Sequence, residues 1–159
     1  MILIFLLLPF LLSFKLIDVP FVQQRDHFCG PASLSSLLKY YGLDVSQEEI
    51  AKSVYDPKLK GALITDLENY ARKKGFKTEL KQGSLEEVKV LIDRGIPPIL
   101  LIDMGKLWVS VPHYIVIVGY EGRVFYAHTG YEAKKAFEEG KLEGMWSKMG
   151  KVMLIVYPP

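Results

Sequence analysis

The stretch from Phe21 to Gly42 reads FVQQRDHFCGPASLSSLLKYYG and contains the only cysteine of the chain, Cys29. Pro31 suits the first turn of a helix, where its missing N–H group is no loss. The small and apolar residues that follow cover most of a helix circumference, and Gly42 stands where a left-handed C-terminal cap is wanted. The stretch therefore predicts a buried helix that starts at the cysteine.

Cys29 at a helix start would meet unpaired backbone N–H groups and the positive end of the helix dipole. Both favour the thiolate, which is the nucleophilic form. On residue type alone, a lone cysteine is more often a small core hydrophobe, and that alternative stays open. Gln23 lies six residues upstream, and His113 lies in the apolar run VPHYIVIVGY. A single cysteine with a histidine distant in sequence is the pattern of a thiol nucleophile and its base. The alternative for His113 is a core histidine bonded to the backbone.

Gln23 through Leu34, QQRDHFCGPASL, resembles the signature Q-x5-C-G-x-A-x-L of the bacteriocin-processing (double-glycine leader) cysteine peptidases, which are papain-like. The segment HYIVIVGY, which His113 opens, is similar to the histidine strand of that family. The resemblance runs from about Val19 to the C-terminus. It implies that Cys29 is the nucleophile, that His113 is its partner, and that the side-chain amide of Gln23 helps to bind the oxyanion. Gln24 is the alternative if the register is shifted by one residue.

One position departs from the family pattern. The family usually follows its histidine with an aspartate in an Asp-Pro pair, whereas the residue sixteen positions after His113 is Thr129, in the sequence His128-Thr129-Gly130. A hydroxyl can accept the ring N–H but supplies no negative charge. A second imidazolium would disfavour the first, which argues against His128. We therefore predict that the Thr129 hydroxyl orients His113.

Composition limits the other possibilities. The 159 residues suffice for one domain, and half of them are hydrophobic, so a sizeable core needs no disulfide. One cysteine excludes an internal disulfide and a multi-cysteine zinc site, and the three dispersed histidines lack metal-ligand spacing. The net charge is only +2 and no basic run occurs, which argues against nucleic acid. We predict no cofactor and no metal, and a peptide or protein substrate.

The chain begins with an apolar run from Met1 to Phe14, MILIFLLLPFLLSF. The run is short for a membrane-spanning helix, which needs roughly twenty residues, and it lacks the basic start and cleavage site of a standard signal peptide. The alternative is a buried strand or helix of the domain. Because the family-like part starts near Val19, we predict that residues 1–18 are a signal peptide or membrane-anchoring segment. The peptidase domain, residues 19–159, would then be exported or membrane-associated, facing the extracytoplasmic side.

Three helix starts share one pattern, a hydroxyl residue followed three positions later by glutamate, at Ser46, Thr65 and Ser84. The predicted helices end near residues 54, 74 and 95. Apolar runs predict strands at 76–80, 96–103, 111–120, 123–127 and 152–157, and a further helix is predicted at 134–146. Helices first and mainly antiparallel strands afterwards indicate an α+β domain, in which the Cys29 helix packs on the sheet in a papain-like arrangement.

The function that these patterns favour is a cysteine peptidase, acting through a Cys–His thiolate and a Gln-assisted oxyanion hole. The resemblance implies cleavage after small residues such as Gly-Gly. Two alternatives remain open on the sequence. One is a catalytically weak or inactive relative that binds peptides. The other is a different thiol acyl-transfer enzyme, such as an amidase or transpeptidase.

Overall fold

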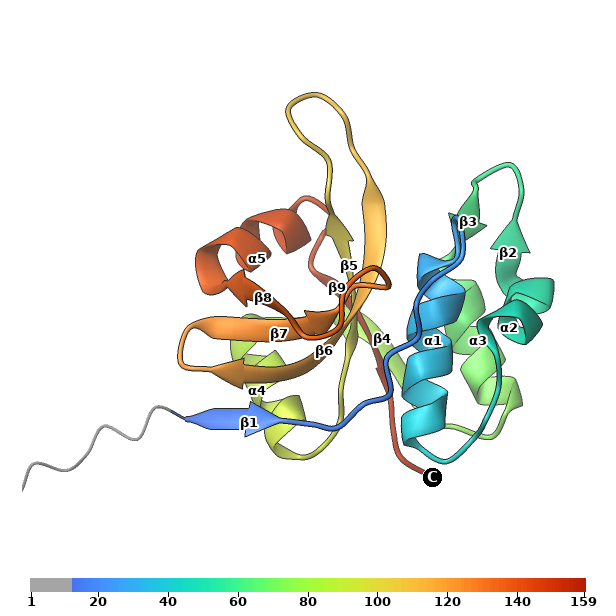
Figure 1. Ribbon diagram of the computed structural model, residues 1–159, viewed down its shortest axis with the longest axis horizontal. Helices are drawn as coiled ribbons and strands as arrows, with labels where there is room; N and C mark the ends of the chain where they lie inside the picture. The colour runs from blue at the N-terminus through green and yellow to red at the C-terminus, as the bar shows by residue number, and fades with distance from the viewer. Residues whose placement is uncertain (1–12) are drawn as a thin grey trace, which may run out of the picture.

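The computed structural model describes residues 13–159 and confirms the predicted α+β class. Helices α1, α2 and α3 stand together on one side of an antiparallel sheet, and α4 and α5 lie on the other (Figure 1). The helices are α1 (Cys29–Tyr40), α2 (Gln47–Val54), α3 (Ile64–Lys73), α4 (Leu85–Asp93) and α5 (Glu139–Ser147).

Two of the three predicted helix caps are confirmed. The Ser46 hydroxyl accepts the Glu49 N–H, and the Ser84 hydroxyl accepts the Glu87 N–H, each at 3.1 Å. The third prediction is wrong, because α3 begins before Thr65 and its N-cap residue is Leu63, which has no capping side chain. At that end, the Leu63 carbonyl accepts the first intrahelical hydrogen bonds.

The main sheet has seven strands, with the spatial order β4-β9-β5-β6-β7-β8 and with β1 paired to β6. Every pairing is antiparallel. A separate two-stranded ribbon is formed by β2 and β3. The strands are β1 (Phe14–Leu16), β2 (Tyr55–Asp56), β3 (Gly61–Ala62), β4 (Thr78–Gln82), β5 (Ile99–Asp103), β6 (Pro112–Glu121), β7 (Val124–His128), β8 (Lys135–Glu138) and β9 (Val152–Val156).

The segment predicted as one helix, residues 134–146, is instead a strand followed by a helix. Phe137 is buried opposite Phe125 of β7, so β8 extends the sheet before α5 starts at Glu139. The Glu138 carboxylate caps α5 by accepting the Lys141 N–H at 3.2 Å. Pairing with β7 is a long-range contact, and it overrides the local helical pattern.

The folded part begins earlier than the predicted boundary at Val19. Strand β1 pairs with the C-terminal end of β6, where Leu16 lies opposite Gly119. The next residue, Ile17, is buried. Residues 1–12 lie outside the described residues, so export or membrane attachment stays a prediction. Within residues 13–159, no helix is both long enough and apolar enough to cross a membrane.

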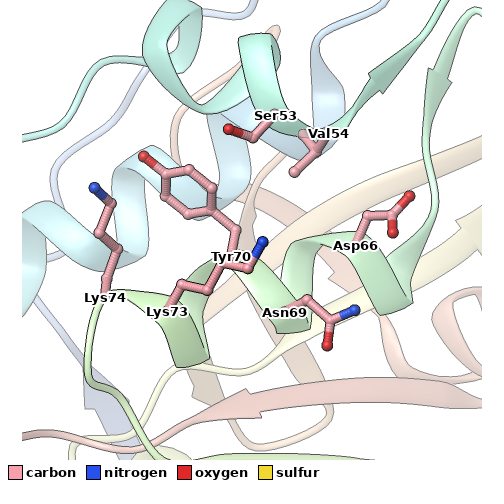
Figure 2. Close-up of a pocket in the computed structure, with 7 residues that line it drawn as sticks. All are labelled: Ser53, Val54, Asp66, Asn69, Tyr70, Lys73 and Lys74. Atoms are coloured by element: carbon pink, nitrogen blue, oxygen red, sulfur yellow. The ribbon is translucent and has the colours of Figure 1, made fainter.

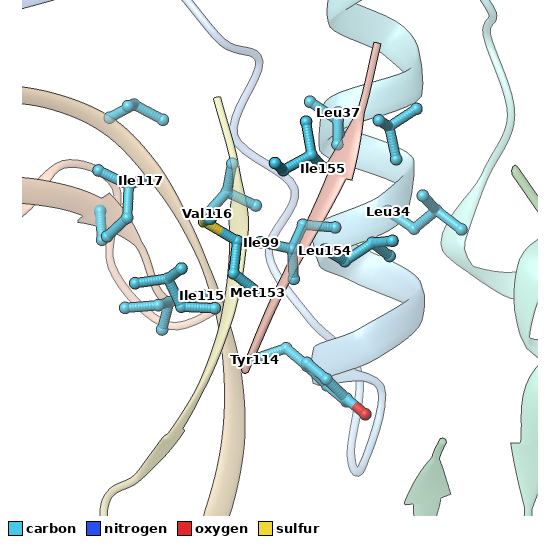
Figure 3. Packing of buried hydrophobic residues seen from close by; sticks show 14 of the residues in the cluster. Leu34, Leu37, Ile99, Tyr114, Ile115, Val116, Ile117, Met153, Leu154 and Ile155 are labelled. Carbon is cyan, nitrogen blue, oxygen red and sulfur yellow. The ribbon is translucent and has the colours of Figure 1, made fainter. Parts of the chain in front are cut away.

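One part of the core lies between α1 and the sheet (Figure 3). Leu34 and Leu37 of α1 are fully buried, and Ile99, Leu154 and Tyr114 on the sheet side belong to the same cluster. Burying one leucine side chain stabilises a fold by about 1.5–3 kcal/mol. This packing fixes α1, and therefore its first residue, relative to β6.

Candidate active site

Cys29 is the first residue of α1 and is half-buried. The preceding N-cap residue, Phe28, provides no side-chain cap, so the helix start keeps backbone N–H groups free for other acceptors. The backbone N–H groups of Tyr114, Gly30 and Cys29 itself lie near the Cys29 sulfur and favour its charged form. Tyr114 belongs to β6, so the thiol lies where the helix start meets the start of that strand.

Gly30 allows the start of α1 to lie close to Tyr114 of β6. A Cβ atom at Gly30 would lie 3.2 Å from the ring of Tyr114, tighter than most contacts in proteins. The Tyr114 hydroxyl donates to the Ala62 carbonyl of β3 at 2.8 Å, which holds the ring in place. The glycine after the cysteine therefore serves packing of α1 on β6.

Burial raises the pKa of the Cys29 thiol, because the thiolate loses hydration; the backbone N–H groups lower it by a smaller amount. This differs from the lowered pKa that the helix start alone suggests. At this site, desolvation is the larger effect, and it favours the neutral thiol.

His113 is the second residue of β6 and is only 4% exposed. Its Nε2 atom lies 2.5 Å from the backbone carbonyl oxygen of Thr129. A carbonyl oxygen can only accept, so Nε2 carries the proton and Nδ1 is left to act as the base. Burial lowers the pKa of His113, and the bond to the Thr129 carbonyl raises it by less. His113 directly precedes Tyr114, whose N–H group lies near the Cys29 sulfur.

The prediction for Thr129 named the wrong atom. The Thr129 hydroxyl accepts the N–H groups of Glu132 and Tyr131, at 3.0 and 3.3 Å, and closes a tight turn. The backbone carbonyl of Thr129, not the hydroxyl, faces His113. Where the family usually has a carboxylate, His113 here bonds a neutral backbone carbonyl, which every residue type has.

His128 stands outside this arrangement. Its Nε2 atom donates to the Val19 carbonyl at 2.7 Å, and its Nδ1 atom accepts the Lys134 N–H at 3.1 Å. Burial lowers the pKa of His128, which keeps the ring neutral. Both ring nitrogens are occupied, so His128 ties the segment before α1 to the end of β7.

Gln23 and Gln24 have different environments. Within residues 13–159, the exposed Gln23 side chain has no hydrogen-bond partner, and its backbone carbonyl accepts the Gln47 side-chain amide at 2.8 Å. The same Gln47 side chain accepts the Arg25 N–H at 3.0 Å. In contrast, the Gln24 side chain donates to Tyr131. Gln23 therefore keeps a free amide on a backbone that the buried Gln47 holds in place.

A pocket of about 250 Å³ lies elsewhere, between α2 and α3 (Figure 2). Asp66, Asn69, Tyr70 and Lys73 of α3 line it, together with Ser53 at the end of α2. Neither Cys29 nor His113 borders it.

Among the residues that the structure describes, no cluster of three or more metal-ligating side chains occurs.

Comparison with known proteins places this arrangement in a family. The model of the Peptidase_C39 like family matches residues 16–154, which include Cys29, His113 and Thr129. The chain belongs to the Peptidase_C39 like family. A search of curated proteins finds no match.

Solved structures show the same fold for this C39-like chain. A C39-like peptidase from Bacillus anthracis matches with a TM-score of 0.74 and 20% identity, over 91% of this chain and 98% of that one. The peptidase domain of Streptococcus ComA, a bifunctional ABC transporter, gives 0.74 and 22%, with the same coverages. A double glycine motif protease from an AMS/PCAT transporter, solved with its leader peptide, gives 0.74 and 19%, over 91% and 95%. The predicted papain-like peptidase fold is thereby confirmed.

Three features of this C39-like site have no signal in the sequence. They are the hydrogen bond from Gln47 to the Gln23 backbone, the N–H group of Tyr114 near the Cys29 sulfur, and the ring of Tyr131, which stacks on His113. Each depends on contacts between segments that are far apart in sequence. A glutamine after a helix cap and a tyrosine in a polar turn are ordinary surface residues by pattern.

Proposed function

We propose that the chain is a cysteine peptidase in which Cys29 attacks the peptide bond. His113 accepts the thiol proton and donates it to the leaving amine. One observation supports this most directly. The backbone segment that carries His113 also brings the next N–H group, that of Tyr114, near the Cys29 sulfur. A thiol and an imidazole on adjoining backbones, in a C39-like fold, are what acyl transfer through a thioester requires.

The resting pair is neutral, because burial raises the pKa of Cys29 and lowers that of His113. His113 therefore acts as a general base during the attack: Nδ1 takes the thiol proton as the sulfur bonds to the carbonyl carbon. The imidazolium then gives that proton to the leaving amine as the C–N bond breaks. Water, deprotonated by the same nitrogen, hydrolyses the thioester and restores the thiol.

The oxyanion of each tetrahedral intermediate needs donors that are already in place. The Cys29 N–H group at the helix start is one candidate. The free side-chain amide of Gln23 is the second, and Gln47 holds the backbone that carries it. Gln24 is the poorer candidate, because its amide group bonds Tyr131.

The substrate in this proposal is a peptide cleaved after small residues such as Gly-Gly. The double glycine motif protease solved with a leader peptide shares the fold, which supports a peptide as the ligand class. A second candidate is a relative that binds peptides without cleaving them. It is favoured by the raised pKa of Cys29 and by the neutral acceptor at His113.

The test compares wild type with Cys29→Ser on quenched peptides that carry Gly-Gly or, as a control, Val-Val before the cleavage site. Wild type should hydrolyse the Gly-Gly peptide, while Cys29→Ser should lose hydrolysis and keep both peptide binding and thermal stability. Binding without hydrolysis by wild type would favour the second candidate. Unchanged hydrolysis by Cys29→Ser would end the cysteine-peptidase proposal.

A further inference from the structure

The ring of Tyr131 covers the imidazole of His113. The two ring centroids are 5.4 Å apart, and the ring planes lie 15° from parallel. His113 is 4% exposed, whereas Tyr131 is 63% exposed. The tyrosine ring is therefore an outer layer that lies between the imidazole and the solvent.

The same turn supplies both the cover and the hydrogen-bond acceptor. The Thr129 carbonyl accepts from Nε2 of His113, and Tyr131 follows two residues later. Two hydrogen bonds between Thr129 and Glu132 close the turn. The Thr129 N–H donates to the Glu132 carbonyl at 3.0 Å, and the Thr129 hydroxyl accepts the Glu132 N–H at 3.0 Å. The Thr129 carbonyl and the Tyr131 ring are therefore held on one hydrogen-bonded turn.

Gln24 holds this turn from the other side. Its backbone N–H donates to the Gly130 carbonyl at 2.9 Å, and its side-chain amide donates to the Tyr131 hydroxyl at 3.3 Å. Gly130 has a φ of +83°, and a Cβ atom there would lie 2.3 Å from Oε1 of Gln24. Gln24 lies five residues before Cys29, so one side chain links the segment that enters α1 to the turn that supports His113.

We propose that Tyr131 is a positioning residue for His113 and that Gln24 holds Tyr131 in place. The inference rests on the proposed function, since a positioned imidazole matters only if it reacts. A hydrogen bond to a neutral carbonyl orients a ring well only where water cannot compete for the donor. The stacked ring excludes that water and presents its π face to the imidazolium that forms during catalysis. It thereby does part of what a carboxylate would do.

The direct readout is the Nε2 proton of His113 in a proton NMR spectrum. A proton shielded from water exchanges slowly and gives a separate low-field resonance, which is assigned through its loss in His113→Gln. His128 provides an internal reference, because its Nε2 proton bonds the Val19 carbonyl and its ring contacts Phe21 edge-on. Tyr131→Ala should remove the His113 resonance and leave the His128 resonance.

Two further variants serve as matched controls. Tyr131→Phe keeps the ring and should keep the resonance, with somewhat faster exchange because the bond to Gln24 is lost. Tyr126→Ala removes a tyrosine whose hydroxyl bonds Glu121 on β6, and it should leave both resonances unchanged. Retention of the His113 resonance in Tyr131→Ala would overturn the proposal. If Tyr131→Ala loses both resonances, Gln24→Ala decides: faster exchange at His113 alone supports the proposal, and unchanged exchange overturns it.

The kinetic readout separates positioning from substrate binding. Tyr131→Ala should lower kcat by about tenfold to a hundredfold with little change in KM, while Tyr126→Ala keeps the wild-type kcat. A change confined to KM would overturn the proposal by making Tyr131 a substrate contact. If wild type hydrolyses no peptide, the proposed function fails, but the NMR comparison still decides whether Tyr131 shields His113.

Discussion

The start of α1 and the turn from Thr129 to Glu132 each hold one half of the candidate Cys–His pair, and they hold it by different means. Nine consecutive residues of α1, Gly30 to Leu38, are buried, and the helix packs on β6. The turn buries Thr129 and leaves Tyr131 mostly exposed. Apolar packing fixes the thiol, whereas a few hydrogen bonds and one stacked ring fix the imidazole.

This difference predicts that stability and activity can be separated by mutation. Loss of apolar contacts at α1 removes burial that the whole domain shares, so it should appear in the free energy of unfolding. Loss of polar contacts at the turn disturbs the orientation of His113, so it should lower kcat in addition to a smaller loss of stability.

Leu34→Ala should have the largest effect on the α1 side. The side chain is fully buried between the helix and the sheet, so its truncation should lower the free energy of unfolding by about 3 kcal/mol. Denaturant unfolding measures this. Val90→Ala on α4, where the side chain is largely exposed, is the matched control and should change stability little. Equal losses in the two variants would contradict the view that α1 is fixed by its buried face.

Gln23→Ala should lower kcat by about a hundredfold, equivalent to about 2.7 kcal/mol, because one oxyanion donor is lost. Gln23→Glu keeps the size but removes the donor, so it should be at least as slow. Thermal stability should stay at the wild-type value in both, since the Gln23 side chain is exposed. A rise in KM alone would make Gln23 a residue that binds substrate and takes no part in stabilising the oxyanion.

Thr129→Val should have a smaller effect, about 1–2 kcal/mol in the free energy of unfolding, because the N–H groups of Tyr131 and Glu132 lose their hydroxyl acceptor. The displaced carbonyl should also reduce kcat severalfold, on the order of a 1 kcal/mol loss. Thr129→Ser keeps the hydroxyl and should match wild type. Thr129→Asp should not raise kcat, because its carboxylate would take the place of the hydroxyl in the turn. A faster Thr129→Asp enzyme would show that the side chain reaches His113.

The sequence predicts the α1 half of the site better than the turn. The Cys-Gly-Pro entry, the Ser46 and Ser84 caps and the apolar strand after His113 are local patterns, and each element is found where its pattern predicts it. The turn depends on a backbone carbonyl, which no residue type signals. Its link to Gln24 joins residues more than a hundred positions apart. For the same reason, the pattern of residues 134–146 predicts a helix, whereas β8 forms through its pairing with β7.

The most direct test of the neutral Cys29–His113 pair is the pH dependence of Cys29 alkylation by iodoacetamide. The chain has one cysteine, so the measured rate belongs to Cys29 alone. Because burial raises the pKa of Cys29, the rate should rise in a single step whose midpoint lies above the ordinary thiol value of about 8.5. His113→Ala should keep that step at high pH while losing peptide hydrolysis. A plateau of reactivity below pH 7 that disappears in His113→Ala would reveal a resting thiolate–imidazolium pair and contradict this account.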